Sequence, residues 1–102
     1  MNEVIRAMEE RRSIRKFKPT MPPKADLEQI VEAGLYAANG KGKQATLIVA
    51  VTDKELRDQL AEINAEIGGW EKGFDPFYGA PVIFIVLADK NWPTHVYDGS
   101  LV

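Results

Sequence analysis

A cluster of cationic and hydroxyl side chains near the N-terminus carries the clearest chemical signal in this sequence. Residues 10–18, which read Glu-Arg-Arg-Ser-Ile-Arg-Lys-Phe-Lys, hold five cationic side chains and one acidic side chain, a net charge of +4. The whole chain of 102 residues carries −2, so everything outside the cluster sums to −6. A positive cluster on an otherwise acidic protein predicts a site for one small anion rather than for a long polyanion.

The residue types in this cluster suit phosphate. Arg11 and Arg12 offer paired N–H donors that match two phosphate oxygens, and Ser13 adds a short hydroxyl donor. The alternative is a basic connector that follows a helix and stabilises its C-terminus. Both interpretations are compatible with the residues alone.

An extended backbone would sort the side chains of the cluster onto two faces. Ser13, Arg15 and Phe17 would then share one face, whereas Ile14 and Lys16 would share the other. That arrangement would form a cradle for a phosphate group, with an apolar group behind it.

Hydrophobic periodicity predicts helices and two buried strands around this cluster. The helices are expected over about residues 3–10, 24–38 and 53–67, and the strands over 46–51 and 82–87. Both strands are apolar without alternation, so both of their faces need cover. A last helix is expected to begin near the C-terminus with Asp98 as its cap.

Several residues predict how these helices end and pack. Asn2 is a suitable cap for the first helix, and Thr52 forms a capping box with Glu55 ahead of the third. Gly34 lies inside the second helix, where it either permits close packing or is simply tolerated. Four apolar residues in the third helix recur at helical spacing and are expected to face the core: Leu56, Leu60, Ile63 and Ile67.

Two irregular segments separate the predicted elements. Residues 39–44, Asn-Gly-Lys-Gly-Lys-Gln, form either a plain connector or a loop that approaches a ligand. Residues 68–81 contain four aromatic residues and four glycines. Their rings could stack on a flat ligand, cover a partner subunit, or fill the domain's own core.

Composition limits the remaining function classes. The chain has no cysteine, which excludes disulfides and a cysteine nucleophile, and fits a cytoplasmic location. Its one histidine, His95, has no second ligand nearby, so no metal site is expected. We see no bilayer-spanning run and no secretory signal, and the acidic balance argues against nucleic acid as a partner. The length fits one domain over residues 1–102.

Read in order, these features resemble the nitroreductase family of flavin enzymes. The resemblance rests on the early Arg-Arg-Ser-Ile-Arg-Lys-Phe segment, the end of the second helix, the 39–44 loop, the first strand, Asp-Pro-Phe-Tyr-Gly-Ala-Pro at 75–81, and Tyr-Asp-Gly-Ser-Leu-Val at 97–102. It implies an α+β fold in which helices pack on a small mixed β-sheet. Family chains continue through a long central helix and further strands, so this chain resembles their N-terminal portion and is truncated relative to the family.

The resemblance implies FMN as the cofactor. Arg11, Arg12 and Ser13 would bind its phosphate and ribityl chain. Arg15 would approach the pyrimidine edge of the flavin, where a cation stabilises the negative charge that develops on reduction.

Asn39 and Gln44 occupy positions at which the family contacts flavin, often the flavin bound mainly by the other subunit. The sequence departs from the family there, because the usual Ala-Pro-Ser reads Ala-Ala-Asn at 37–39 and the usual Gln-Pro-Trp reads Gln-Ala-Thr at 44–46. The implied assembly is a homodimer with flavin at the interface.

The implied activity is that of an FMN-dependent oxidoreductase. NAD(P)H would donate a hydride, and a nitroaromatic, a quinone or a similar small molecule would accept the electrons in a ping-pong reaction. Such a reaction needs no dedicated catalytic acid or base from the chain. The alternative is a non-catalytic flavin- or phosphate-binding module.

Overall fold

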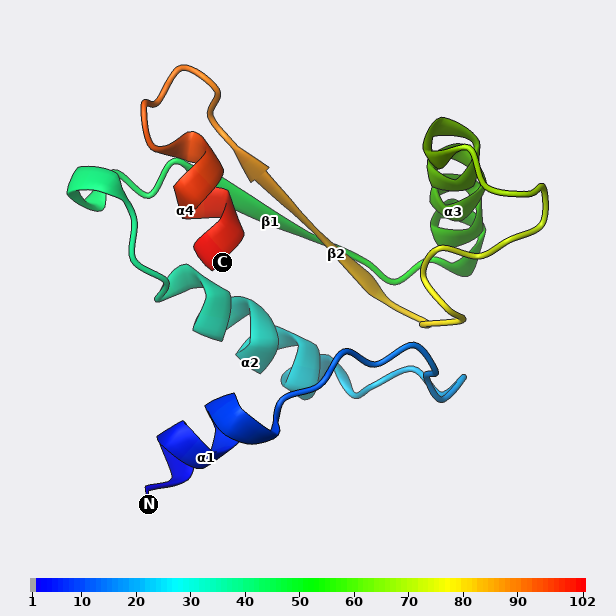
Figure 1. The fold of residues 1–102 in the computed structure, drawn as a ribbon, viewed down its shortest axis with the longest axis horizontal. Coiled ribbons are helices and arrows are strands. Elements are labelled where there is room, and N and C mark those ends of the chain that lie inside the picture. The colour runs from blue at the N-terminus through cyan, green and yellow to red at the C-terminus, as the bar shows by residue number, and fades with distance from the viewer. Residues whose placement is uncertain (1) are drawn as a thin grey trace.

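The computed structural model describes residues 2–102, which form four α-helices and a two-stranded sheet (Figure 1). Among these residues no helix combines the length and the apolar character that a bilayer span requires. In chain order the elements are α1 (Glu3–Glu10), α2 (Lys24–Leu35), a 3-10 turn (Gly40–Gly42), β1 (Thr46–Val51), α3 (Lys54–Gly68), β2 (Ile83–Ala88) and α4 (His95–Leu101).

The two strands pair antiparallel, with Thr46 opposite Ala88 and Val51 opposite Ile83. The first strand has the predicted bounds, and the second begins and ends one residue later than predicted. The small sheet under helices is confirmed. The mixed sheet that the resemblance implies would also contain a parallel strand, whereas the described residues form an antiparallel pair. Both α2 and α4 pack against the sheet, and α3 stands at its far end (Figure 1).

Close packing explains the glycine inside α2. A Cβ atom at Gly34 would lie 2.9 Å from Cδ1 of Ile48 in β1 and 3.1 Å from Cγ1 of Val102. A real Cβ atom essentially never lies as close as 2.9 Å, so a larger residue here would force the Ile48 side chain to shift. The helix ends at Leu35, three residues before the predicted end, because the amides of Tyr36 and Ala37 turn back to carbonyls three residues earlier.

The helix caps are confirmed for α1 and corrected for α3. Oδ1 of Asn2 accepts the amide N–H of Ile5 at 2.9 Å, as predicted. At α3 the cap is Asp53, whose Oδ2 accepts the amide N–H of Leu56 at 3.2 Å. The predicted cap Thr52 lies one residue too early, because Asp53 already supplies an extended backbone and an acceptor.

The buried face of α3 also differs from the prediction. Arg57, Ala61 and Ala65 are buried, whereas Leu56 is 44%, Ile63 is 50% and Ile67 is 82% exposed. The physical reason is the returning chain of residues 70–80, which packs on the alanine face, where small side chains allow a backbone to approach. Leu56, Ile63 and Ile67 therefore face outward, whereas Leu60 of the same predicted stripe is half-buried and lines a groove beside β2.

The surface of the chain is large for its mass. Its accessible area is 8343 Å², whereas a compact monomer of this mass exposes about 5,800 Å². The radius of gyration is 15.6 Å, against about 13 Å for a compact domain. Leu47 in β1 and Leu87 in β2 remain 59% and 50% exposed. The described residues thus leave apolar strand surface without the cover that the sequence predicts.

Candidate cofactor-binding site

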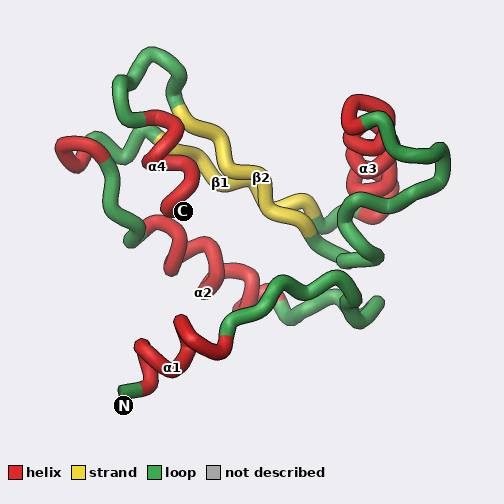
Figure 2. The backbone as a smooth tube through the Cα atoms, in the orientation of Figure 1, coloured by secondary structure: helices red, strands yellow, loops and turns green. Residues whose placement is uncertain are grey.

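The basic cluster lies in the connection between α1 and α2, which is drawn as loop in Figure 2. Residues 11–18 are all exposed, and the amides of 12–18 donate to no backbone carbonyl within residues 2–102. No carboxylate in that part of the chain pairs with a cation of this segment. Side-chain cations and backbone N–H groups are therefore both available to an anion.

The three arginines of the cluster differ in what they already bind. Nη1 of Arg12 donates to the carbonyl oxygens of Glu9 at 2.7 Å and Arg11 at 2.8 Å. Arg12 thus stabilises the C-terminus of α1, as the connector interpretation predicts. The guanidinium groups of Arg11 and Arg15 make no hydrogen bond to another described residue.

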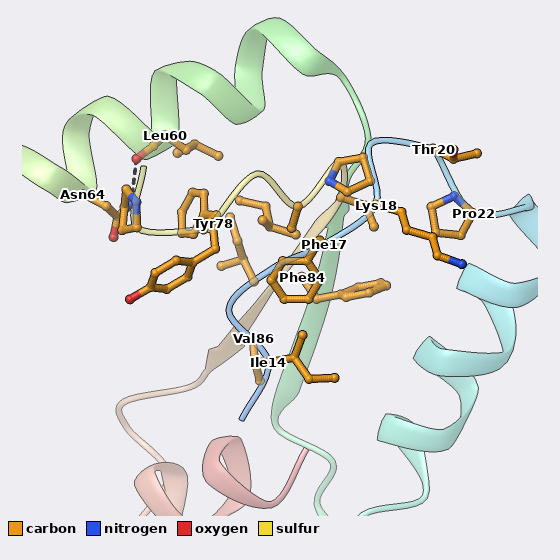
Figure 3. Close-up of a pocket in the computed structure, with 17 residues that line it drawn as sticks. Ile14, Phe17, Lys18, Thr20, Pro22, Leu60, Asn64, Tyr78, Phe84 and Val86 are labelled. Carbon is orange, nitrogen blue, oxygen red and sulfur yellow. Dashed lines mark hydrogen bonds between the residues drawn. The ribbon is translucent and has the colours of Figure 1, made fainter. Parts of the chain in front are cut away.

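The predicted alternation of faces in the cluster is wrong. Ile14 and Phe17 line the same apolar groove, of about 1020 Å³, and lie near Phe84 and Val86 of β2 (Figure 3). No strand partner among the described residues holds the segment in a two-residue repeat, and Lys18 and Thr20 line the same groove as Ile14 and Phe17. Ile14 and Phe17 face the same groove as residues of β2 but remain 66% and 43% exposed, and Arg15 is not among the groove residues.

The loop at 39–44 brings its two predicted site residues together. Oδ1 of Asn39 accepts the amide N–H of Gln44 at 2.9 Å, and Nε2 of Gln44 donates to the carbonyl of Leu35 at 3.4 Å. Gln44 keeps its side-chain oxygen and one N–H for a ligand. These hydrogen bonds hold the loop in one conformation.

Asp98 ties this loop to α4. Its carboxylate is buried, with Oδ1 accepting the amide N–H of Gly40 at 3.0 Å and Oδ2 accepting the hydroxyl of Thr94 at 2.9 Å. The prediction that Asp98 caps the last helix is wrong, because α4 begins three residues earlier, at His95. The amide of Asp98 already bonds to the carbonyl of Thr94 at 2.9 Å within that helix.

The basic cluster and the 39–44 loop lie at opposite ends of α2 (Figure 1). The cluster precedes the N-terminus of α2 and the loop follows its C-terminus, and a helix of 12 residues is about 18 Å long. One copy of the chain therefore forms two separate groups: Arg11, Arg12, Ser13 and Arg15 in one, and Asn39 and Gln44 in the other.

Sequence reasoning missed an ion pair between the buried Arg57 and the partly exposed Asp75, which holds the aromatic segment on α3. Arg57 is buried, and its Nε donates to the carbonyl of Ala80 at 2.8 Å while its Nη2 donates to Oδ2 of Asp75 at 2.5 Å. The carboxylate of Asp75 also accepts the amides of Phe77 at 2.9 Å and Gly79 at 2.8 Å. No sequence motif marked Arg57, and its four-residue spacing from Ala61 on α3 is the one signal of its burial.

These bonds set the ionisation of Asp75. Partial burial alone would raise its pKa, but the hydrogen bonds from Arg57 and from the amides of Phe77 and Gly79 together hold the pKa below its usual value.

Three aromatic rings of the same segment form a row. The ring centroids of Trp70 and Phe74 are 5.6 Å apart, and those of Phe74 and Tyr78 are 5.9 Å apart. All three rings are partly exposed.

Comparison with known proteins decides the family. The model of the "Nitroreductase family" matches residues 8–100. The chain belongs to the nitroreductase family. Among curated nitroreductase relatives, an FMN reductase [NAD(P)H] of Bacillus subtilis is 32% identical over 89% of this chain and 34% of its own length. An NADPH-flavin oxidoreductase of Vibrio harveyi is 39% identical over 61% of this chain and 26% of its own length.

Solved structures of nitroreductases share the fold. An FMN-bound nitroreductase of Desulfitobacterium hafniense matches with a TM-score of 0.86 and 33% identity, covering 99% of this chain and 60% of that one. An FMN-bound nitroreductase of Bacteroides fragilis matches with a TM-score of 0.89 and 25% identity over the same shares. The chain spans about a third of the length of its curated relatives and about half to 60% of the solved chains.

Proposed function

We propose that this chain is the part of an FMN-dependent oxidoreductase that binds the cofactor's phosphate and flavin edge. The observation that carries the proposal is the exposed cationic segment, in which Arg11, Ser13 and Arg15 make no ion pair or side-chain hydrogen bond within residues 2–102. Relatives that are named for FMN and NAD(P)H support it. We also propose a cytoplasmic location, with which the lack of cysteine is compatible.

The residues present fit a phosphate-bearing flavin. Arg11 and Ser13 offer donors that no other described group occupies, and the unbonded amides of residues 12–18 add further donors. Ile14 and Phe17 line a groove together with residues of β2, while their side chains remain 66% and 43% exposed.

FMN, when bound, would accept a hydride from NAD(P)H and pass electrons to a nitroaromatic, a quinone or a similar acceptor. Arg15 would stabilise the negative charge that reduction places on the flavin edge. Arg12 would orient the segment by fixing the end of α1, through its bonds to the carbonyls of Glu9 and Arg11.

We further propose a homodimer whose flavin sites each use both copies. The two groups of predicted site residues lie at opposite ends of α2, so one copy does not place them around one ligand. A site built from residues 11–15 of one copy and 39–44 of the other would use both. The exposed apolar residues of the strands supply surface for such an interface.

The test is FMN affinity and turnover of the intact protein. Arg11→Ala and Ser13→Ala should each weaken FMN binding, because a charge-assisted contact is worth about 1.5–3 kcal/mol, or roughly one to two decades. Lys24→Ala, an exposed cation on α2, is the matched control and should leave affinity unchanged. Unchanged affinity in both test variants would refute the site. A yellow protein that oxidises no NAD(P)H would instead support a non-catalytic flavin-binding module.

A further inference from the structure

We propose that Asp98 is a positioning residue that holds the 39–44 loop in the shape with which it contacts the flavin. This inference rests on the proposed function, because it assigns the loop a flavin contact. It concerns a residue 58 positions away from the loop glycine that it binds.

The burial of Asp98 is the first observation. The residue is 2% exposed, so its carboxylate has exchanged water for protein donors. One oxygen accepts the amide of Gly40 at 3.0 Å, and the other accepts the hydroxyl of Thr94 at 2.9 Å. Burying an ionised group is costly unless donors compensate for the lost water. The hydrogen bond from the amide of Gly40 to Asp98 couples the loop to α4.

Two further contacts bind the same loop to the chain that leads into α4. Nε1 of Trp92 donates to the carbonyl of Gly40 at 3.3 Å, so both backbone polar groups of this glycine are bound. The ammonium of Lys43 lies 5.7 Å from the centroid of the Trp92 ring. A Cβ atom at Gly40 would lie 2.1 Å from Oγ1 of Thr94, so only glycine permits this approach.

The loop needs such restraints because its own backbone is strained. Lys41 has φ of 55° and Gln44 has φ of 52°, in the left-handed region that non-glycine residues rarely adopt. A strained conformation persists only where the surroundings determine it. Asp98 and Trp92 restrain the loop from outside, and the hydrogen bond between Asn39 and Gln44 restrains it from within.

The consequence is that the flavin-facing groups of Gln44 and Asn39 depend on a carboxylate that never touches the ligand. Without Asp98 the amide of Gly40 would lose its acceptor and the loop would sample other shapes. Binding FMN would then require the loop to be ordered again, which lowers the affinity.

The experiment compares three test variants and one control variant in the intact protein. Asp98→Ala should speed hydrogen exchange of the amides at 40–44 at least tenfold and raise the FMN dissociation constant about tenfold. Asp98→Asn should keep both within about threefold of wild type, because its amide oxygen still accepts from Gly40 and its NH2 group can donate to Thr94. Gly40→Ala should resemble Asp98→Ala. Asp26→Ala, at an exposed aspartate of α2 that makes no side-chain hydrogen bond within residues 2–102, is the control.

Failure of this inference is distinguishable from failure of the proposed function. If Asp98→Ala and Gly40→Ala loosen the loop but leave FMN affinity unchanged, while Arg11→Ala weakens it, the positioning role is wrong and the cofactor site stands. If Asp98→Ala leaves exchange at 40–44 unchanged, the role is wrong as well. If Asp98→Asn is as impaired as Asp98→Ala, geometry alone does not account for the effect and the inference is overturned. If no variant, Arg11→Ala included, alters FMN affinity, both proposals fail.

Discussion

Replacing Arg57 by alanine should destabilise the protein by about 3 kcal/mol. The side chain makes a bond to the carbonyl of Ala80 at 2.8 Å, an ion pair with Asp75, and a stacking contact 5.4 Å from the ring centroid of Phe77. The carbonyl bond is worth about 1.5 kcal/mol. Since the Asp75 side chain is 33% exposed, the ion pair is discounted to about 1 kcal/mol. The ring contact adds about 0.5–1 kcal/mol.

The assay is chemical denaturation of the intact protein at one fixed concentration, so that any assembly equilibrium is the same for each variant. Lys54→Ala is the matched control, because Lys54 also pairs with an aspartate but is 87% exposed. It should cost no more than about 0.5 kcal/mol. A loss for Arg57→Ala as small as that of Lys54→Ala would refute the view that this pair holds the aromatic segment on α3.

The pH dependence supplies a second test of the same network. Because the folded state holds the pKa of Asp75 below its unfolded value of 3.8, the ionised carboxylate stabilises the fold above that value. That stability is lost as the pH falls through the folded pKa. The difference in stability between wild type and Asp75→Asn should therefore narrow below pH 3.8. A difference that stays constant from neutral pH into that range would show that ionisation of Asp75 contributes nothing.

Three other outcomes are expected. Arg15→Ala should lower the flavin reduction potential, since reduced flavin loses a positive neighbour; an unchanged or raised potential in spectroelectrochemistry would contradict this role. Light scattering of the FMN-loaded protein should give a dimer, and an active flavin-loaded monomer would be evidence against shared sites. Residues 1–102 expressed alone should exchange amide hydrogens rapidly, bind hydrophobic dyes and retain little FMN, because their strands stay exposed; a protected monomer that keeps FMN would contradict the need for further cover.

Local structure was predictable from local signals. The strands followed from β-branched apolar runs, and the start of α1 followed from Asn2, whose cap bond forms as expected. The close approach at Gly34 was one of two alternatives that the sequence left open. The strands and the cap of α1 depend on residues that are near in sequence or on intrinsic preference, whereas the approach at Gly34 depends on the distant Ile48 and Val102.

The wrong predictions concern features that depend on residues distant in sequence. The buried face of α3 was mispredicted because the packing of residues 70–80 selects Arg57 and the alanines over the leucine–isoleucine stripe. The role of Asp98 could not be predicted, because its partner Gly40 lies in another segment. The faces of the basic cluster were wrong because Ile14 and Phe17 follow a groove on β2 rather than a strand repeat. The phosphate chemistry of the cluster remains a prediction from its residue types, whereas its geometry could not be predicted from them.

Helix α2 lies between the two groups of predicted site residues, so its length sets the distance between them. Each residue of an α-helix adds 1.5 Å and turns the chain by 100°. Deleting or inserting one residue in α2 would therefore rotate the 39–44 loop relative to the basic cluster. The same change would separate Gly40 from Asp98. Substitutions on the exposed face of α2 should be tolerated freely, but changes in its residue count should not.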